Sequence, residues 1–282
     1  LAGAVRTYVT RFGVAPGKRV AIFANNDDGL ATADTLREAG VTHASGPPTF
    51  WRQVLLFAAP GELAGCRLQQ VTMGGEAVNQ GLLDQVAAAF PGARVVHIYA
   101  STELGRLFAV TDGREGFPAR FLEEPPEDGT ALRIVDGELQ ARSGNAMQGY
   151  AGQVGGAAGD DGWLATGDLV ETAGDRVLFR GRRSDVINVG GRKVMPATVE
   201  AVLRQAEGVA DIRVYARRSS LVGELVAADV VAARGREEAA VRAAVNELAR
   251  TRLASHEVPR LLRFVTSIAH NQAMKVVRSS PA

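Results

Sequence analysis

Residues 163–200 carry the sequence WLATGDLVETAGDRVLFRGRRSDVINVGGRKVMPATVE, in which three apolar runs alternate with polar turns. The first run ends in residues 166–168 (Thr-Gly-Asp), which predict a short turn rich in hydrogen-bond acceptors. The second leads into a tight turn at 181–185 (Gly-Arg-Arg-Ser-Asp). The third ends at 190–191 (Gly-Gly), where a backbone without Cβ atoms can approach a ligand closely. Behind it, Pro196 stands where a helix would begin.

These turns place three chemical groups at the ends of consecutive predicted strands: the Asp168 carboxylate, the Arg182 guanidinium and the Gly190-Gly191 backbone. A carboxylate accepts hydrogen bonds from paired hydroxyls, and a guanidinium offers a fork of donors. The combination therefore suits a ribose and a phosphate.

The composition is that of an ordinary globular protein, with 46% hydrophobic and 22% charged residues. The 282 residues are enough for two domains, since domains have roughly 100–200 residues. The net charge of +1 argues against a nucleic-acid partner or an anionic membrane surface. The single cysteine, Cys66, cannot form an internal disulfide, which favours the reducing cytoplasm. No apolar run approaches the ~18 residues of a membrane span, and no signal-peptide pattern opens the chain.

The N-terminal part reads as one βα unit of a larger sheet. Residues 20–24 form an apolar run typical of a buried strand, polar residues 25–29 follow, and a helix is predicted to end at Ala39. The loop has no Gly-x-Gly-x-x-Gly pattern, so a dinucleotide site there is disfavoured.

The rest of the chain divides into an α/β region and a small α+β region. In the first, strands are predicted at 68–73 and 94–98, and Asn79 is expected to cap the helix between them. A hairpin follows, with strands at 132–135 and 138–142. In the second region we expect helices near 196–206 and 236–253, and strands near 211–216, 224–232 and 261–266.

A second group of polar residues, Tyr99 to Glu103 (Tyr-Ala-Ser-Thr-Glu), follows the strand 94–98. It offers an aromatic face for a base, a hydroxyl for a phosphate, and a carboxylate for Mg²⁺, which prefers oxygen ligands. Taken alone, Ser-Thr-Glu after a strand is as easily a helix cap. For His43 and Trp51, packing inside the protein is favoured over contact with a ligand.

Two segments, 163–169 (WLATGDL) and 181–191 (GRRSDVINVGG), resemble signature motifs of the AMP-forming adenylating enzymes. That superfamily includes acyl-CoA synthetases, peptide-synthetase adenylation domains and luciferases. Residues 99–103 resemble its aromatic-small-x-Thr-Glu motif, and 40–50 resemble the strand and turn that line its acyl pocket. The resemblance covers residues 40–278.

The resemblance implies an α/β fold: an adenylate-forming-enzyme-like sheet region with a small β-barrel piece, hinged to a small α+β C-terminal domain. The implied division is a βα segment of open origin at 1–40, a partial AMP-binding large domain at 41–183, and a mobile C-terminal domain at 184–282. Ser184 takes the hinge position, where the family more often has Asp or Lys. Two resemblances compete for the N-terminal segment: residues 13–22 resemble an early stretch of the adenylating enzymes, and residues 8–40 resemble part of the sarcosine oxidase α-subunit. The second leaves a flavin- or NAD-linked module as a minor alternative.

The resemblance also implies the roles of individual residues. The short motif 275–278 (KVVR) matches the family's catalytic lysine, although Met274 replaces the usual glycine before it. We expect AMP to bind through Asp168, Arg182, Tyr99 and Thr102, with the carboxylate and the aromatic ring on one sheet. The full set of implied residues is catalytic Lys275, Thr102 and Glu103, with Glu103 also holding Mg²⁺; nucleotide- or thiol-binding Gly74, Gly75, Glu76, Tyr99, Asp168, Arg182, Gly190 and Gly191; and the hinge Ser184.

The implied reaction has two steps. A small carboxylic acid reacts with MgATP to give an acyl-adenylate and pyrophosphate, and a thiol of coenzyme A then gives a thioester. A phosphopantetheine thiol on a carrier protein is the close alternative. A catalytically incompetent nucleotide-binding relic is a third hypothesis, since no Ser/Thr/Gly-rich phosphate loop ending in Lys occurs between Leu1 and Ala282.

Overall fold

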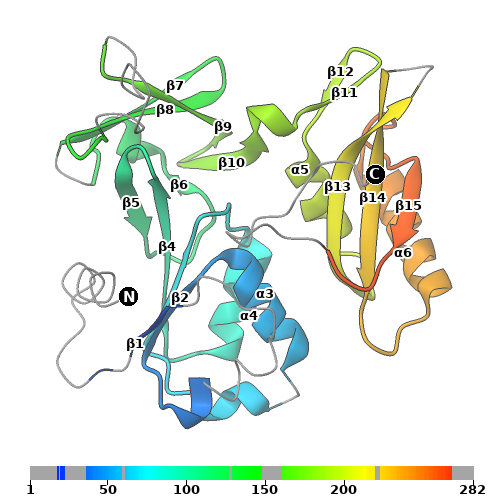
Figure 1. Ribbon diagram of the computed structural model, residues 1–282, viewed down its shortest axis with the longest axis horizontal. Helices are drawn as coiled ribbons and strands as arrows, with labels where there is room; N and C mark the ends of the chain where they lie inside the picture. The colour runs from blue at the N-terminus through cyan, green and yellow to red at the C-terminus, as the bar shows by residue number, and fades with distance from the viewer. Residues whose placement is uncertain are drawn as a thin grey trace. The chain divides into compact units, whose positions relative to one another are not determined.

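The computed structural model describes residues 18, 20–22, 36–58, 61–126, 129–147, 161–219 and 223–268. The chain divides into two compact units (Figure 1). The first comprises Leu1–Phe117, Glu124–Thr130 and Ser143–Ala157, and the second comprises Pro118–Glu123, Ala131–Arg142 and Ala158–Ala282. The predicted domain division at 40 and 184 stays a prediction, and the second unit spans residue 184. No helix of the described part of the chain is long and apolar enough to cross a membrane.

The first unit contains a five-stranded sheet in the order β1-β2-β3-β4-β5. Strands β1 to β4 run parallel, and β5 is antiparallel to β4. Two helices follow β2 and β3 and pack against each other (Figure 1). The bounds are β1 Val20–Ile22, β2 His43–Gly46, α3 Pro48–Phe57, β3 Gln70–Gly74, α4 Gln80–Ala89, β4 Arg94–Ser101 and β5 Gly105–Val110, with a short helix η1 at Glu62–Gly65.

The core of this unit lies between the sheet and the two helices. Strand β3 is buried at four successive positions, as expected for a parallel strand that is covered on both faces. Trp51 and Val54 of α3 and Val86 of α4 are fully buried against Met73. The predicted cap of α4 is confirmed, because the Asn79 side chain accepts a hydrogen bond from the Leu82 amide at 3.0 Å.

The helix-cap interpretation of residues 101–103 is wrong. Strand β4 extends through Ser101, three residues beyond the predicted end, and the chain turns directly into β5. The Ser101 hydroxyl does act as a cap, but of this turn: it accepts a hydrogen bond from the Leu104 amide at 3.1 Å. Gly105, with φ 69°, completes the turn in a conformation that favours glycine.

The middle of the chain forms a second five-stranded sheet, in the order β6-β10-β9-β8-β7. It corresponds to the β piece predicted between the two larger regions. The predicted hairpin is confirmed, and its turn residues Asp136 and Gly137 both have positive φ, 50° and 74°, as a type I′ turn requires. The bounds are β6 Phe117–Pro118, β7 Thr130–Val135, β8 Glu138–Ser143, β9 Leu164–Ala173 and β10 Arg176–Arg182, with short helices η2 at Ala119–Leu122 and η3 at Arg183–Asp185.

The third sheet belongs to the second unit and has the order β12-β11-β14-β13, with β15 pairing parallel to β14. Helices α5 and α6 cover it with Val199, Leu203, Val241 and Val245, all buried. All five elements predicted here are present, and Pro196 is the first residue of α5 as expected. The bounds are β11 Ile187–Val189, β12 Arg192–Val194, α5 Pro196–Leu203, β13 Val209–Ser219, β14 Gly223–Ala232, α6 Glu238–Arg252 and β15 Leu261–Phe264.

Candidate nucleotide site

The first unit gathers polar residues at the carboxyl ends of its parallel strands. Strands β2, β3 and β4 end at Gly46, Gly74 and Ser101, and this is the edge at which open α/β sheets bind ligands. The predicted residues Gly74, Gly75 and Glu76 follow β3, and Thr102 and Glu103 follow β4. The structure therefore brings the first unit's predicted site residues to one edge of one sheet.

The two glycines after β3 are needed by the fold itself. A Cβ atom on Gly74 would lie 2.6 Å from Cγ1 of Ile98, closer than side chains approach. Gly75 has φ 87° and nothing within 4 Å of an added Cβ, so here it is the backbone conformation that requires glycine. Their predicted place beside adenine stays a prediction.

Glu76 serves the helix that follows β2. Its Oε2 accepts hydrogen bonds from the backbone amide and the hydroxyl of Thr49, at 3.1 and 2.7 Å. Arg52 lies 3.9 Å from the same oxygen. A carboxylate is favourable at the N-terminus of a helix, where amide groups lack partners within the helix, so Glu76 stabilises the start of α3.

Tyr99 lies inside β4, where its ring stacks on Phe108 of β5 at 5.2 Å between centroids and 20° between planes. Phe108 in turn contacts Phe117 at 4.7 Å. The tyrosine ring therefore has one face against an aromatic cluster and is half-buried, which fixes the plane that its other face would offer to a base.

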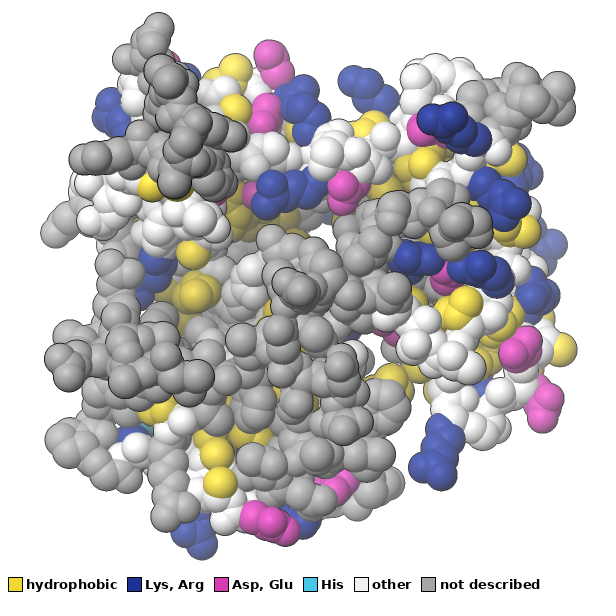
Figure 2. Space-filling view, in the orientation of Figure 1, with side chains coloured by type: hydrophobic (Ala, Val, Ile, Leu, Met, Phe, Trp, Pro, Cys, Tyr) yellow, Lys and Arg dark blue, Asp and Glu magenta, His cyan; other side chains and the backbone are white. Residues whose placement is uncertain are grey.

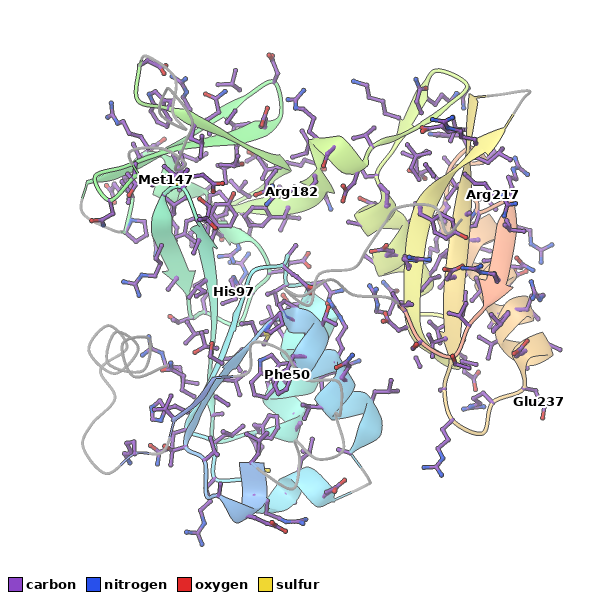
Figure 3. The ribbon with its side chains drawn as sticks, viewed as in Figure 1. Phe50, His97, Met147, Arg182, Arg217 and Glu237 are labelled. Carbon is purple, nitrogen blue, oxygen red and sulfur yellow. The ribbon has the colours of Figure 1, made fainter. Side chains whose placement is uncertain are left out.

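Thr102 and Glu103 lie in the turn between β4 and β5, with Thr102 exposed and Glu103 half-buried. The Glu103 carbonyl accepts a hydrogen bond from the Met147 amide at 2.7 Å, which holds this turn to the segment after β8 (Figure 3). No group of three or more metal-binding side chains occurs among the described residues. One carboxylate is nevertheless compatible with Mg²⁺, which is commonly held by one or two carboxylates together with substrate phosphates.

The packing interpretation of His43 and Trp51 agrees with the structure. Trp51 is fully buried, and its Nε1 donates a hydrogen bond to the Thr72 carbonyl at 3.3 Å. The His43 ring contacts the Thr42 hydroxyl at 3.0 Å. Burial, together with the nearby charge of Lys18, lowers the pKa of the His43 imidazole.

The predicted turn at 166–168 is wrong: these residues form a bulge inside β9. Glu138 of β8 pairs with Leu169, and Gln140 pairs with Ala165, so three residues of β9 face a single residue of β8. The excess is accommodated because Gly167 adopts φ 76°. The apolar residues on both sides continue the strand, which is why the polar residues did not end it.

Hydrogen bonds from β8 hold the bulge in place. The Thr166 hydroxyl donates to the Leu139 carbonyl at 2.7 Å and accepts from the Asp168 amide at 3.2 Å. The Gly167 amide donates to Oε1 of Glu138 at 2.7 Å.

Asp168 and Arg182, predicted as a pair, are brought together by this bulge. Nε of Arg182 lies 2.8 Å from Oδ1 of Asp168, and its Nη1 donates to the Thr166 carbonyl at 3.2 Å. Figure 3 labels Arg182 at the end of β10. The Asp168 side chain is 14% exposed and that of Arg182 is 50% exposed. A mostly buried carboxylate beside a half-exposed guanidinium offers acceptors and donors to the same ligand.

Arg182 ends β10 and Arg183 follows it in η3, where Arg183 pairs with a different carboxylate. Nη2 of Arg183 lies 3.0 Å from Oε2 of Glu138. Ser184 follows in η3, and its hydroxyl donates to the Asp185 carboxylate at 3.1 Å. From the sequence, Glu138 was predicted only as part of a hairpin strand. Its position directly after the Asp136-Gly137 turn was the one feature that could have pointed to a functional role.

Gly190 and Gly191 form the turn between β11 and β12. Their φ values of 56° and 85° fit a two-residue hairpin turn that requires positive φ at both positions. The Gly191 amide donates to the Asn188 side chain at 2.9 Å, and nothing lies within 4 Å of a Cβ added to either glycine. The turn is thus open on its outer side.

The expectation that Asp168 and Tyr99 share one sheet is wrong. Tyr99 belongs to the first sheet and Asp168 to the second, because the chain leaves the first sheet after β5. Lys275 and Met274 lie outside the described residues, so the predicted catalytic lysine stays a prediction.

Two family models match the chain. The AMP-binding enzyme model covers residues 6–151, and the model of the AMP-binding enzyme C-terminal domain covers residues 198–275. This chain belongs to the AMP-binding enzyme family. The second match includes Lys275, and the first includes residues 8–40, so the resemblance of that segment to sarcosine oxidase gains no support.

Curated relatives of this chain include CoA ligases and a carrier-protein ligase. A methyl-dioxo-octahydro-indenyl-propanoyl:CoA ligase of Mycobacterium tuberculosis is 32% identical over 260 residues, 88% of this chain and 50% of the relative. A fatty acid–acyl-carrier-protein ligase of Streptomyces coeruleorubidus is 28% identical over 262 residues, 87% of this chain and 50% of the relative. The chain thus spans half the length of both relatives.

Solved structures show the same fold. A benzoate CoA ligase from Burkholderia xenovorans aligns with a TM-score of 0.79 at 20% identity, covering 95% of this chain and 61% of the other. An ATP-bound MatB structure from Rhodopseudomonas palustris aligns with a TM-score of 0.76 at 22% identity, covering 98% and 62%. The predicted adenylate-forming-enzyme fold is therefore confirmed.

Proposed function

We propose that this AMP-binding enzyme family member activates a small carboxylic acid with MgATP and transfers the acyl group to a thiol. In the first step the carboxylate oxygen displaces pyrophosphate from the α-phosphate and forms an acyl-adenylate. In the second, the thiol attacks the acyl carbon, AMP leaves, and a thioester forms. The supporting observation is the pair of family matches, at residues 6–151 and 198–275, in a chain whose relatives include CoA and carrier-protein ligases.

We assign the nucleotide contacts one residue at a time, as the sequence predicts them. Asp168 accepts from the ribose hydroxyls, with Arg182 beside it as the donor. The Tyr99 ring, whose plane is fixed by stacking on Phe108, is assigned to the adenine, together with Gly74 and Gly75. This assignment is supported by the mostly buried Asp168 carboxylate and by the stacked Tyr99 ring, since both are held ready for a ligand by neighbours of their own unit.

Thr102 and Glu103 are assigned to the phosphates. The Thr102 hydroxyl donates to the α-phosphate, and the Glu103 carboxylate contributes a ligand for Mg²⁺, which when bound neutralises charge on the phosphates. Their position in a turn at the carboxyl edge of the sheet supports the assignment. Lys275 is assigned to adenylation, because a mobile point charge can meet the carboxylate and α-phosphate oxygens as negative charge develops.

Coenzyme A is the proposed acceptor, and a carrier-protein phosphopantetheine is the second candidate. Both present the same thiol, and the relatives include a ligase of each kind. Gly190 and Gly191 are assigned to the path of the thiol, which fits a turn that is open on its outer side. A cytoplasmic location is proposed from the single cysteine, Cys66.

Two assays with the 282-residue chain test the function. In the first, acyl-AMP and coenzyme A are supplied, and we expect thioester to form at a rate that Lys275→Ala leaves nearly unchanged. In the second, ATP–pyrophosphate exchange is measured across a panel of carboxylic acids, and we expect severely impaired exchange. The reason is that no Ser/Thr/Gly-rich loop between Leu1 and Ala282 would hold the β- and γ-phosphates.

The outcomes separate the hypotheses. Absence of thioester from acyl-AMP, with AMP still bound, would favour the nucleotide-binding relic over the ligase. Robust exchange would reveal a phosphate site that is not a Ser/Thr/Gly-rich loop.

We predict that Ser184→Pro changes the two half-reactions unequally. Proline fixes φ near −65° and disfavours helical conformation in the preceding residue, so it biases one orientation of the proposed C-terminal domain. The measurement compares initial rates of adenylate formation and of thioester formation, with Ser184→Ala as the control for losing the hydroxyl. Equal responses of both steps to proline would contradict the hinge assignment.

A further inference from the structure

Glu138 stands between the nucleotide site and the proposed hinge, and each of its two carboxylate oxygens has its own partner. It is the first residue of β8, and its side chain is 12% exposed. Oε1 accepts from the Gly167 amide at 2.7 Å, and Oε2 pairs with Arg183 at 3.0 Å. One side chain therefore contacts both the β9 bulge and the residue directly before Ser184.

A second carboxylate makes a parallel connection between the same two segments. Asp168, which lies in the bulge itself, pairs with Arg182 at 2.8 Å, and Arg182 also donates to the Thr166 carbonyl. The bulge is thus tied to two successive arginines at the end of β10. Figure 2 shows Lys and Arg side chains (dark blue) and Asp and Glu side chains (magenta) scattered together over the visible face.

A bound nucleotide would affect the Asp168–Arg182 pair and the Glu138–Arg183 pair differently. Asp168 is the proposed ribose acceptor, so a bound ribose competes directly with Arg182 for its oxygens. Glu138 touches the backbone amide of Gly167, which carries no contact with the ligand in the proposed site. The ion pair between Glu138 and Arg183 therefore remains when the ribose binds to Asp168. A ligand that orders the bulge also orders Glu138, because Glu138 accepts a hydrogen bond from Gly167.

We propose that Glu138 is a positioning residue that couples occupancy of the nucleotide site to Arg183 and so to the start of the hinge. The inference rests on the proposed function, because it takes Asp168 as a nucleotide contact and Ser184 as the hinge. A nucleotide that orders the bulge holds Arg183 against Glu138, and by linkage a held Arg183 favours the nucleotide. Loss of AMP then releases the residues that lead into the C-terminal segment.

The rate of trypsin cleavage after Arg183 reports whether Arg183 is paired with Glu138. The protease must take the Arg183 side chain into its own pocket to cut the bond between Arg183 and Ser184, and it cannot do so while Arg183 pairs with Glu138. We expect saturating AMP to slow cleavage of this bond in the unmodified chain by about fivefold or more, the usual lower limit of coupling between two sites. Mass spectrometry assigns the cut to this bond among the other arginines.

Glu138→Gln separates the two contacts. The amide oxygen can still accept from Gly167, but the charge that attracts Arg183 is removed, and charge-assisted hydrogen bonds are about twice as strong as neutral ones. Because coupling is reciprocal, we expect this variant to bind AMP about fivefold more weakly than the unmodified chain, while its cleavage no longer responds to AMP. Glu171→Gln is the matched control, because Glu171 of β9 pairs with Arg180 of β10 at 2.8 Å and lies outside the 166–168 bulge.

Calorimetry with AMP distinguishes the ways in which the proposal can fail. If Glu138→Gln binds AMP and its cleavage still slows as in the control, the coupling through Glu138 is overturned. It is equally overturned if the unmodified chain binds AMP without any change in cleavage. If the unmodified chain does not bind AMP at all, the proposed function has failed, and the inference fails with it. Glu138→Asp, too short to reach both partners, gives the same test if the glutamine variant does not fold.

Discussion

Replacing Asp229 with alanine is expected to lower the free energy of unfolding by about 3–5 kcal/mol, the range found when one partner of a buried ion pair is removed. Asp229 lies in β14, is 1% exposed, and accepts from arginines on both neighbouring strands. Arg213 of β13 hydrogen bonds to Oδ2, and Arg263 of β15 donates to both oxygens at 2.9 and 3.0 Å. The Tyr215 hydroxyl completes the set at 3.2 Å.

The large effect follows from what the variant leaves behind. Arg213 has a side chain that is only 7% exposed, so without the carboxylate its charge stays in a site with little access to water. Urea unfolding of the whole chain measures the loss. Glu247→Ala is the matched control, since Glu247 pairs with Arg250 on the exposed side of α6 and such surface pairs contribute about 0–1 kcal/mol. A loss below 1 kcal/mol for Asp229→Ala would contradict the prediction.

The Asp229 carboxylate also makes the free energy of unfolding depend on pH. Burial alone would raise the pKa of Asp229, but the hydrogen bonds and charges of Arg263 and Arg213 outweigh it and hold the pKa below the ordinary value. A lowered pKa in the folded state means that the stabilisation is complete above about pH 4 and is lost as the pH falls through the folded-state pKa. The unmodified chain should therefore lose stability in acid more steeply than Asp229→Ala.

In the third sheet, the sequence predicts the helices and strands but not the buried ion pair. The helices and strands between residues 196 and 264 were predicted within a few residues, because their apolar side chains recur at the spacing of one buried face. Asp229 was not predicted to matter. It interrupts the apolar run of β14, and the arginines that justify its burial lie 16 and 34 residues away along the chain.

The second sheet shows the corresponding limit for the candidate site. Asp168 and Arg182 were predicted as functional partners, and they do pair, because the two strands form a hairpin with a short connection. The bulge that presents Asp168 depends on the register against β8, about 30 residues earlier, which local pattern does not fix. Glu138 was missed for the same reason: both of its partners lie on elements distant in sequence.

Asp168→Ala is expected to weaken AMP binding by about 1.5–3 kcal/mol, the scale of losing hydrogen bonds to a charged group. In the proposed site the carboxylate is the acceptor for both ribose hydroxyls. Its side chain is mostly buried and its amide is held by Thr166, so the acceptor is already in position and little ordering is needed on binding. Alanine removes the acceptor and leaves Arg182 with only its hydrogen bond to the Thr166 carbonyl among the contacts described above.

The stability of the chain should change much less than its affinity for AMP. Arg182 is half-exposed, and an ion pair with one exposed partner contributes about 0–1 kcal/mol to folding. Calorimetric titration with AMP, paired with urea unfolding of the same sample, separates the two effects. Asp168→Asn tests whether charge or shape matters, since asparagine keeps one acceptor oxygen at the same place. If a folded Asp168→Ala chain binds AMP with unchanged affinity, Asp168 is not a nucleotide contact. If the free energy of unfolding falls by as much as the binding free energy, the role of Asp168 is structural.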